Sequence, residues 1–185
     1  MINYKRILLK LSGEALSDNR QKLILDAKHL DIVATAIKSM YEQGVQIAIV
    51  VGAGNIWRGK LAEQIGIERS TADYMGMLGT IINALALQSA IEKTGLECRV
   101  MSAIEVKAVS EPYIKKRAIS HMEKGRVVIF GGGTGNPFFT TDTTATLRAI
   151  EVEADAILMA KNGVDGVYDD DPRTNKDANF IPEIT

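Results

Sequence analysis

The sequence contains one cysteine, one tryptophan, four prolines and two histidines among 185 residues. The single thiol, Cys98, excludes an internal disulfide, and the strand-like run around it indicates a buried thiol in a reducing compartment. His29 and His121 lie on or near helical patterns, without the neighbours that a catalytic triad or a metal site requires. We therefore interpret both histidines as structural.

An excess of charge of one sign is also missing. The formal net charge is −1, so the composition gives no basic face that would indicate nucleic-acid binding. No apolar run reaches the roughly 18–20 residues of a membrane span, and Met1 leads into a strand-like segment without a signal peptide. Hydrophobic residues make up 46% of the chain, and its length fits one domain. These observations predict a soluble cytoplasmic α/β protein without a membrane or nucleic-acid partner.

Three times in the chain a helical pattern ends at a glycine and leads into an apolar strand. The glycines are Gly44, Gly95 and Gly125. The predicted helices cover 26–43 with Asp26 as N-cap, 70–93, about 112–124, and the segment after residue 140. The predicted strands cover 4–11, 45–51, 96–101, 126–130 and 156–159. This alternation favours βαβ crossovers and a mainly parallel sheet.

The stretch from 126 to 162 contains a strand, a glycine-rich loop, a helix and a second strand. Gly131, Gly132 and Gly133 follow the first strand, and a cluster of threonines around Asp142 opens the helix. Glycines let backbone N–H groups point at a ligand, and a helix N-terminus adds partial positive charge. The pattern predicts a phosphate-binding loop. The alternative is a tight turn followed by a threonine or aspartate helix cap.

Lys10 stands at the carboxyl end of the first predicted strand and is followed by Ser12 and Gly13. Ligands of open α/β sheets bind beyond the carboxyl ends of the strands, so we expect Lys10 to point toward a site. A strand-end lysine that keeps only its ammonium in water is the alternative.

The loop 52–60 after the second strand resembles two nucleotide-binding motifs without matching either. Residues 54–60 begin like a P-loop, but Leu61 stands where serine or threonine must hold Mg²⁺. A Rossmann fingerprint fails because Trp57 replaces the required small residue. The remaining feature is a glycine loop followed by Arg58. Its guanidinium could hold a phosphate, or it could be a surface charge beside Trp57.

Two further segments carry candidate polar groups. The helix 70–93 contains Gly76 and Gly79, which indicate a close approach by backbone or ligand, because glycine is unfavourable inside a helix. Asp73 near its start could accept hydrogen bonds from sugar hydroxyls, or it could only favour the helix dipole. The successive aspartates at 169–171 could suggest a divalent metal, although a solvated turn is at least as consistent with them.

Four groups thus follow predicted strands: Lys10, the loop 52–58, the loop 131–142, and Asn162 with the loop after it. In a parallel sheet they would share one edge and one cleft. The cleft would offer glycine loops, a lysine, an arginine and a central aspartate, without an obvious nucleophile. This set suits phosphoryl transfer, in which catalysis is mostly positioning and charge neutralisation.

The chain closely resembles the bacterial uridylate kinase (UMP kinase) family of the amino-acid kinase superfamily. The motifs that carry this resemblance are 4–16, 52–59, 73–78, 101–103, 133–142 and 164–168. The resemblance implies a three-layer α/β/α sandwich with a mainly parallel open sheet. It also implies one domain over 1–185, with a UMP-binding lobe at about 1–155 and the start of an ATP-binding lobe at about 156–185. Family members continue for a further quarter of their length, so we expect a C-terminal part to be missing.

The resemblance further implies transfer of the γ-phosphoryl group of ATP to UMP, giving UDP and ADP, in pyrimidine nucleotide biosynthesis. Mg²⁺ would arrive as MgATP, without a metal site on the protein. The implied assembly is a hexamer built from dimers, activated by GTP and inhibited by UTP. The long apolar helix 74–90 is compatible with a dimer contact or with a central core helix.

The family's functional residues can be placed on this sequence. The implied catalytic residues are Lys10, Arg58 and Asp142, with Lys10 neutralising charge and Asp142 orienting it. The implied ATP-binding residues are Lys10, Leu11, Ser12, Gly13, Gly54, Arg58, Asn162, Tyr168 and Asp171. The implied UMP-binding residues are Ala53, Asp73, Thr134, Gly135, Asn136, Pro137, Phe138, Phe139, Thr140 and Thr141.

Ala53 stands where many relatives have glycine, and we expect the change to be tolerated if its φ is negative. Two alternatives to UMP phosphorylation stay open. One is a superfamily enzyme that phosphorylates a carboxylate or carbamate, which Asp73 and the run 138–141 make less favourable than a nucleoside acceptor. The other is a nucleotide sensor without catalysis.

Overall fold

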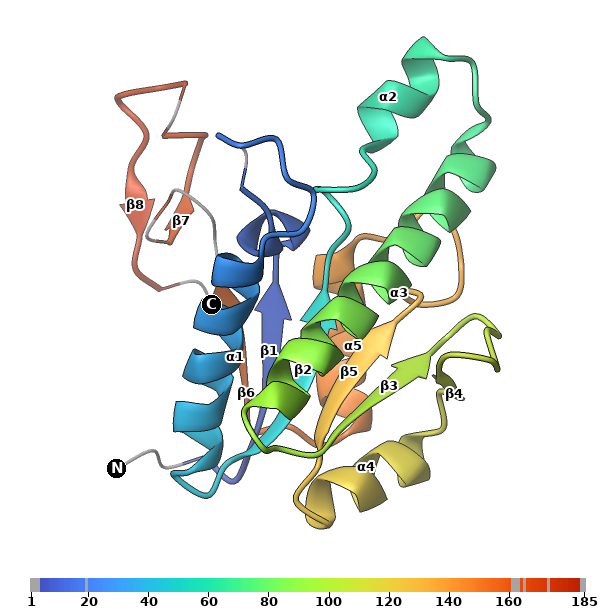
Figure 1. The fold of residues 1–185 in the computed structure, drawn as a ribbon. Helices are drawn as coiled ribbons and strands as arrows, with labels where there is room; N and C mark the ends of the chain where they lie inside the picture. The colour runs from blue at the N-terminus through green and yellow to red at the C-terminus, as the bar shows by residue number, and fades with distance from the viewer. Residues whose placement is uncertain (1–3, 19, 161–163, 165, 173, 184–185) are drawn as a thin grey trace.

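A sheet of six strands in the order β4-β3-β5-β2-β1-β6, with all neighbours parallel, forms the centre of the molecule (Figure 1). The computed structural model describes residues 4–18, 20–160, 164, 166–172 and 174–183. The strands of the sheet are β1 Arg6–Leu11, β2 Gln46–Val51, β3 Cys98–Ser102, β4 Glu111–Pro112, β5 Val127–Gly131 and β6 Ala156–Ala160. The helices are η1 Gly13–Leu16, α1 Ala27–Tyr41, α2 Gly59–Gln64, α3 Arg69–Lys93, α4 Lys115–Glu123 and α5 Thr141–Glu151. A separate antiparallel pair consists of β7 Val167–Tyr168 and β8 Phe180–Ile181.

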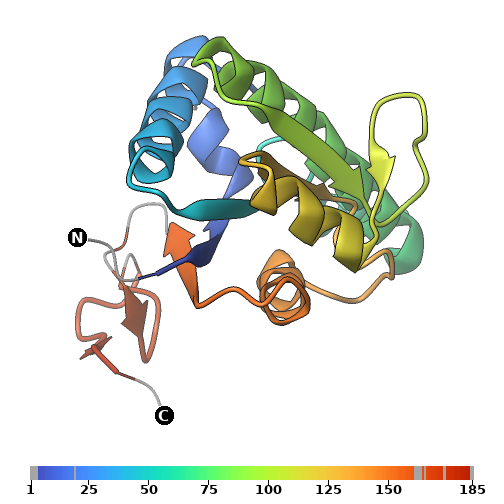
Figure 2. The same ribbon diagram turned by 90° about the horizontal axis from the view of Figure 1, so that it is seen from below.

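Helices cover both faces of the sheet, as Figure 2 shows: α1 and α3 lie on one side, and α4 and α5 lie on the other. Successive residues of a strand point to opposite faces, so a strand covered on both sides must be apolar throughout. The centre of strand β1 follows this rule, because Ile7 and Leu9 face α1 and α3 while Leu8 faces α4 and α5, and its charged residues Arg6 and Lys10 lie toward the two ends of the strand. The predicted α/β/α architecture with a mainly parallel sheet is confirmed.

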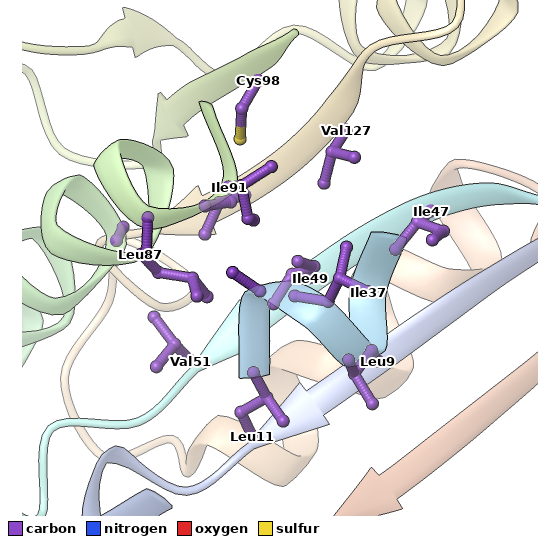
Figure 3. Packing of buried hydrophobic residues seen from close by; sticks show 14 of the residues in the cluster. Leu9, Leu11, Ile37, Ile47, Ile49, Val51, Leu87, Ile91, Cys98 and Val127 are labelled. Carbon is purple, nitrogen blue, oxygen red and sulfur yellow. The ribbon is translucent and has the colours of Figure 1, made fainter. Parts of the chain in front are cut away.

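The larger of the two cores lies under α1 and α3 (Figure 3). Ile37 from α1 and Leu87 from α3 are fully buried there against Ile49 of β2. Helix α1 begins at the expected cap, because the Asp26 side chain accepts a hydrogen bond from the His29 N–H. The core under α4 and α5 is smaller and includes Met122.

Glycines end the helices where the sequence predicts. Gly44, Gly95 and Gly125 have φ values of +84°, +91° and +75°, which belong to the left-handed region and reverse the chain into the next strand. The sequence does not predict the short elements η1, α2, β4, β7 and β8. In the β7–β8 pair, the ring of Tyr168 contacts the ring of Phe180.

Helix α3 is the longest helix and the one whose environment the sequence left open. Its most apolar window has a mean hydropathy of 1.3, so by length and composition α3 could cross a membrane. Half of that window is buried inside the molecule, which is typical of a core helix in a folded domain. Its outer side nevertheless exposes Tyr74, Leu78 and Ile82, which are spaced four residues apart and form one apolar stripe.

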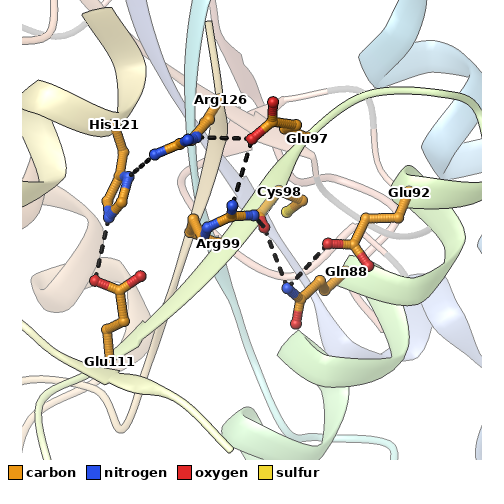
Figure 4. Close-up of polar contacts among 8 residues, drawn as sticks. All are labelled: Gln88, Glu92, Glu97, Cys98, Arg99, Glu111, His121 and Arg126. Carbon is orange, nitrogen blue, oxygen red and sulfur yellow. Dashed lines mark hydrogen bonds and ion pairs between the residues drawn. The ribbon is translucent and has the colours of Figure 1, made fainter. Parts of the chain in front are cut away.

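A polar network stabilises the end of the sheet where the strands begin (Figure 4). Glu97 accepts hydrogen bonds from Arg126 at 2.8 Å and from Arg99 at 3.3 Å. His121 contacts Arg126 through Nδ1 at 3.2 Å and Glu111 through Nε2 at 3.1 Å. These contacts give His121 a structural role, as the sequence predicts. Cys98 is buried beside this network, and its burial raises the pKa of the thiol to about 12.

Candidate active site

The loops that follow β1, β2 and β5 leave the same edge of the sheet. Lys10 is in register with Val50 on one side and with Met159 on the other, and Val50 is in register with Phe130. Parallel neighbours end at the same edge, so the three loops emerge side by side (Figure 1). This confirms the predicted common edge for the first three of the four groups. Asn162 lies outside the described residues.

Lys10 and Asp142 form an ion pair at the centre of this edge. The distance from Lys10 Nζ to Asp142 Oδ1 is 2.7 Å, and the side chains are 12% and 47% exposed. Asp142 Oδ1 is buried and accepts no hydrogen bond of regular geometry from the described part of the chain. Its charge is therefore stabilised by the ion pair with the Lys10 ammonium group. Asp142 also lies in the first turn of α5, where the helix dipole favours a negative charge.

The loop after β1 packs directly against the loop after β2. The Gly52 N–H donates to the Leu11 carbonyl at 2.9 Å, and a side chain at Gly13 would overlap the Gly52 carbonyl oxygen and Asn55. Ser12 caps η1 by accepting from the Glu14 N–H. Gly13 is therefore required for this close approach of two backbones.

A pair of amide side chains, the fully buried Asn83 and the partly buried Asn55, joins the same loop to α3. Asn83 donates through Nδ2 to the Gly52 carbonyl at 2.7 Å and to Asn55 Oδ1 at 2.8 Å. Asn55 donates back to Asn83 Oδ1 at 3.1 Å and also to the Ile24 carbonyl at 2.7 Å. Because buried amides are costly unless they are hydrogen-bonded, this reciprocal pair fixes the loop after β2.

Arg58 lies at the end of the loop after β2 and points its guanidinium back over the loop. Nε donates to the Gly54 carbonyl at 3.1 Å, and Nη2 forms an ion pair with Glu14. The Arg58 side chain is mostly exposed, so an anion in the cleft can reach it. Trp57 turns the other way and donates to the Ala72 carbonyl of α3 at 2.9 Å.

The interior glycines of α3 make room for the loop after β2. A side chain at Gly79 would lie 3.0 Å from the Ala53 methyl group, and one at Gly76 would lie 3.7 Å from the Trp57 ring. The predicted close approach is therefore made by a loop of the protein itself. Ala53 is buried and is not among the described residues with positive φ, so its side chain is accommodated without backbone strain.

The glycine loop after β5 adopts a conformation that only glycine tolerates well. Gly132, Gly133 and Gly135 have φ values of +75°, +59° and +84°. A side chain at Gly132 would lie 2.8 Å from Ser102 Oγ. The Gly132 N–H donates to Thr80 Oγ1 of α3 at 2.9 Å, so a buried hydroxyl holds the loop from one side.

Asp73 connects the start of α3 to the far end of this loop. Its carboxylate accepts from the Phe138 N–H at 2.8 Å and from Arg69 Nε at 3.2 Å. The Phe138 backbone has a φ of +73°, and the Arg69 guanidinium carbon lies 5.7 Å from the centre of the Phe138 ring. Asp73 thus stabilises an unusual backbone conformation in the segment 134–141.

The remaining residues of 134–141 form a turn that leads into α5. Thr134 Oγ1 accepts from the Asn136 N–H, and Thr140 caps α5 by accepting from the Thr143 N–H. Phe138 and Phe139 are both more than half exposed. Gly135, Pro137 and Thr141 belong to the same segment, with Thr141 as the first residue of α5.

Two cavities lie near the Lys10–Asp142 pair: Lys10 lines the first, and Thr141, the residue before Asp142, lines the second. The first, about 460 Å³, lies on the β6 side. It is lined by Lys10, Ser12, Glu14, Ala160, Val164, Gly166, Val167, Tyr168, Asp170, Asp171 and Pro172. The second, about 180 Å³, lies between α3 and the loops after β2 and β5. It is lined by Ala53, Gly54, Trp57, Gly59, Ala72, Gly76, Met77, Thr80, Gly133 and Thr141. The arrangement suits two ligands that meet at a positive charge.

The side chains of Asp169 and Asp170 accept hydrogen bonds from asparagines of the segment that follows them. The side chain of Asn179 and its N–H donate to Asp169 and lower the pKa of its carboxyl group. The side chain of Asn175 does the same for Asp170. Both carboxylates therefore accept hydrogen bonds from asparagine side chains, which agrees with the solvated turn that the sequence left open.

Sequence reasoning missed several residues that shape the site: Thr80, Asn83, Asn55 and Arg148. Each is polar and almost all are buried, and each fixes a loop whose backbone faces the cleft. A polar residue at a core position of a helical pattern, such as Asn83, is the signal that could have found them. That signal gives no partner, because the partners lie far away in the chain.

Comparisons with known proteins agree with this geometry. A family model described as "Amino acid kinase family" matches residues 5–185. A protein named uridylate kinase from Rubrobacter xylanophilus is 59% identical over 181 residues, which cover 97% of this chain and 71% of the relative.

Two solved structures are also similar. The UMP kinase of Bacillus anthracis has 52% sequence identity and a TM-score of 0.88, covering 95% of this chain and 72% of that one. The UMP kinase of Ureaplasma parvum has 41% identity and a TM-score of 0.89, covering 97% of this chain and 75% of that one.

Proposed function

The chain belongs to the amino acid kinase family, and from this premise we propose that it is a uridylate kinase. The enzyme transfers the γ-phosphoryl group of ATP to UMP and releases UDP and ADP, a step of pyrimidine nucleotide biosynthesis. The high identity to proteins with that name over nearly the whole chain supports the acceptor.

The Lys10–Asp142 ion pair between two cavities is the observation that carries the proposal. Lys10 lines the larger cavity, and Asp142 directly follows Thr141, which lines the smaller one. We infer that a phosphoryl group moving from the larger cavity to the smaller one passes Lys10. Neutralising charge on the transferred group is the main catalytic task in phosphoryl transfer.

We assign the larger cavity to the substrate MgATP. Lys10 and the backbone of Leu11, Ser12 and Gly13 are next to the phosphates, with Gly54 and Arg58 between donor and acceptor. Tyr168 and Asp171, which also line this cavity, are assigned to the adenosine part. Mg²⁺ accompanies the nucleotide phosphates as part of this substrate.

We assign the smaller cavity and the segment 134–141 to UMP. Asp73 accepts the ribose hydroxyls, which replace its present contact with the Phe138 N–H. Arg58 exchanges Glu14 for the α-phosphate, to which its planar guanidinium binds well. Ala53 contributes its backbone, and the exposed Phe138 and Phe139 lie beside the base.

In the reaction, an oxygen of the UMP α-phosphate attacks the γ-phosphorus, and the bond to the bridging oxygen of ADP breaks. Lys10 stabilises the negative charge on the transferred group, and Arg58 stabilises the attacking phosphate. Asp142 orients Lys10 and removes no proton, because the attacking phosphate oxygen is already ionised. The protein therefore acts through position and charge.

The exposed stripe Tyr74, Leu78 and Ile82 on α3 supports a further proposal, a homo-oligomer with contacts through this helix. A hexamer, activation by GTP, inhibition by UTP and a cytoplasmic location are proposals that the resemblance implies. Light scattering tests the first, and addition of each nucleotide to the activity assay tests the next two.

The test of the proposed function is a coupled assay of ADP release with UMP, CMP, dCMP and N-acetylglutamate offered separately. We expect turnover with UMP far above that with the other acceptors. Turnover only with N-acetylglutamate would replace the proposal with an amino-acid kinase. The absence of turnover with every acceptor would favour a nucleotide sensor.

A further inference from the structure

We propose that Arg148 is a positioning residue for the acceptor loop, defined as residues 131–135, and that it thereby sets the affinity for the acceptor. The inference rests on the proposed function, because its kinetic readout uses UMP. Arg148 lies in α5 with a side chain that is only 5% exposed. A guanidinium group stays charged in a protein and carries five N–H donors, so its buried position requires specific partners.

Three contacts hold the Arg148 guanidinium. Nη1 donates to Glu151 Oε2 at 2.6 Å within α5. The guanidinium carbon lies 3.8 Å from the centre of the Tyr113 ring. Nη2 donates to the carbonyl oxygen of Gly133 at 3.3 Å. The first two contacts fix the orientation of the guanidinium group. The third contact then holds the Gly133 carbonyl of the acceptor loop at a fixed position.

Tyr113 provides a rigid platform for this arrangement. Its hydroxyl donates to the same Glu151 Oε2 at 2.6 Å, and its N–H donates to the Ser102 carbonyl at 2.9 Å. Its ring meets the Phe130 ring edge to face, with 5.4 Å between the centres. Burial, together with the hydrogen bond to Glu151, raises the pKa of Tyr113, so the hydroxyl remains a donor.

A contact from another helix to the Gly133 carbonyl has a large effect on the conformation of the acceptor loop. Glycine loses more conformational entropy than other residues when it is ordered, so a glycine-rich loop depends on contacts that select one conformation. In a planar trans peptide the carbonyl and the next N–H point in opposite directions. By binding this carbonyl, Arg148 directs the Thr134 N–H away from α5. Gly133 also lines the acceptor cavity, so a rotation of this peptide would change the cavity wall.

The loop is held from two sides. Thr80 of α3 accepts from the Gly132 N–H, and Arg148 of α5 donates to the Gly133 carbonyl. The two neighbouring peptides are thus fixed by different helices. Removing Arg148 leaves the Thr80 contact in place, so the loop should remain attached but lose the orientation of one peptide.

Arg148→Lys separates positioning from stability. A lysine retains the charge for Glu151, but its single ammonium group cannot lie flat on Tyr113 and reach Gly133 at the same time. We expect the KM for UMP to rise about tenfold, equivalent to roughly 1.4 kcal/mol. The KM for ATP should stay near the wild-type value, because Arg148 contacts the acceptor loop and is remote from the larger cavity.

Arg6→Met is the matched control for Arg148→Met. Arg6 is also buried, and it donates to the Val152 carbonyl at the C-terminal end of α5 at 2.5 Å and to Gln46 at 2.9 Å, and neither partner belongs to the acceptor loop. Both methionine variants should lower Tm, but only the Arg148 variant should raise the KM for UMP. A lower Tm for Arg148→Lys with an unchanged KM for UMP, or equal rises in the KM for UMP and ATP, would overturn the proposal.

Hydrogen exchange of the nucleotide-free protein tests Arg148 without relying on activity. The N–H groups of Gly132 and Gly135 are hydrogen-bonded in the loop and report its order. We expect faster exchange across 131–135 in Arg148→Lys than in wild type or Arg6→Met. Equal exchange rates in all three proteins would overturn the proposal. A wild-type protein that does not phosphorylate UMP would instead refute the proposed function.

Discussion

Asp142→Asn should lower kcat about 10²–10³-fold, the usual effect of losing one preorganised stabilising group. Asparagine has nearly the same shape as aspartate, but it removes the negative charge 2.7 Å from Lys10 Nζ. Lys10 is nearly buried, so its ammonium group then lacks a counter-charge and shifts away from its present position. The KM for UMP should change little, because neither side chain lies among the residues assigned to the acceptor.

The same ion pair sets the expected change in stability. Breaking a fully buried pair costs about 3–5 kcal/mol. The Asp142 side chain is 47% exposed, so water can compensate part of the loss for Lys10. We therefore expect the variant to be about 1–3 kcal/mol less stable, within the range for a charged group that loses its partner. Calorimetry with the same buffer and protein concentration measures this difference.

A double-mutant cycle with Lys10→Met tests the reasoning. If Asp142 acts through Lys10, the double variant should have a kcat close to that of Lys10→Met alone. The double variant should also be more stable than Asp142→Asn, because the unpaired ammonium group is gone. The reasoning is refuted if Asp142→Asn lowers kcat by the same factor in both backgrounds, since Asp142 would then act independently of the lysine.

Three other substitutions give separate predictions. Gly79→Ala should lower Tm, because the new methyl group would press against the methyl group of Ala53. Adding Ala53→Gly should restore Tm, and a Tm that stays low in the double variant would contradict the packing argument. Asp73→Asn should raise the KM for UMP and leave the KM for ATP nearly unchanged, whereas a mainly ATP-side defect would show that the sugar assignment is wrong. Hydrogen bonds from the N–H groups of Arg6 and Lys5 lower the pKa of Asp155 in the folded protein from its usual 3.8. The Asp155 carboxylate therefore stabilises the fold above pH 3.8, and this stabilisation is lost as the pH falls through the pKa of Asp155 in the folded protein. Thermal melts in acid should therefore converge for wild type and Asp155→Asn, and a constant gap in Tm down to low pH would contradict this.

The sequence was sufficient for the sheet and most helices, because apolar runs and helix-ending glycines are local signals. Gly44, Gly95 and Gly125 each mark a helix end with a positive φ, which no other residue type adopts as easily. The short elements α2 and β4 carry no such periodicity, so they could not be predicted. The sequence does not show which side of α3 is exposed and which is buried, because both sides are rich in apolar residues and only the packing of the helix distinguishes them.

The candidate site was predictable where a group follows a strand end, and less so where it depends on contacts across the chain. Lys10 and Asp142 were both expected near the cleft, and their ion pair joins residues 132 positions apart in sequence, 10 and 142. Arg148 gave no signal, because an arginine in an amphipathic helix usually faces solvent. Only the fold shows that it lies between Tyr113, Glu151 and the Gly133 carbonyl.

The most direct test of the central claim follows the γ-phosphoryl group itself. Wild-type protein is incubated with UMP and MgATP labelled at the γ-phosphorus, and the products are separated by chromatography. We expect label in UDP, formed in equal amount to ADP, and almost none in UDP with Lys10→Met. Label in inorganic phosphate alone, or label in UDP at the wild-type rate with Lys10→Met, would contradict it.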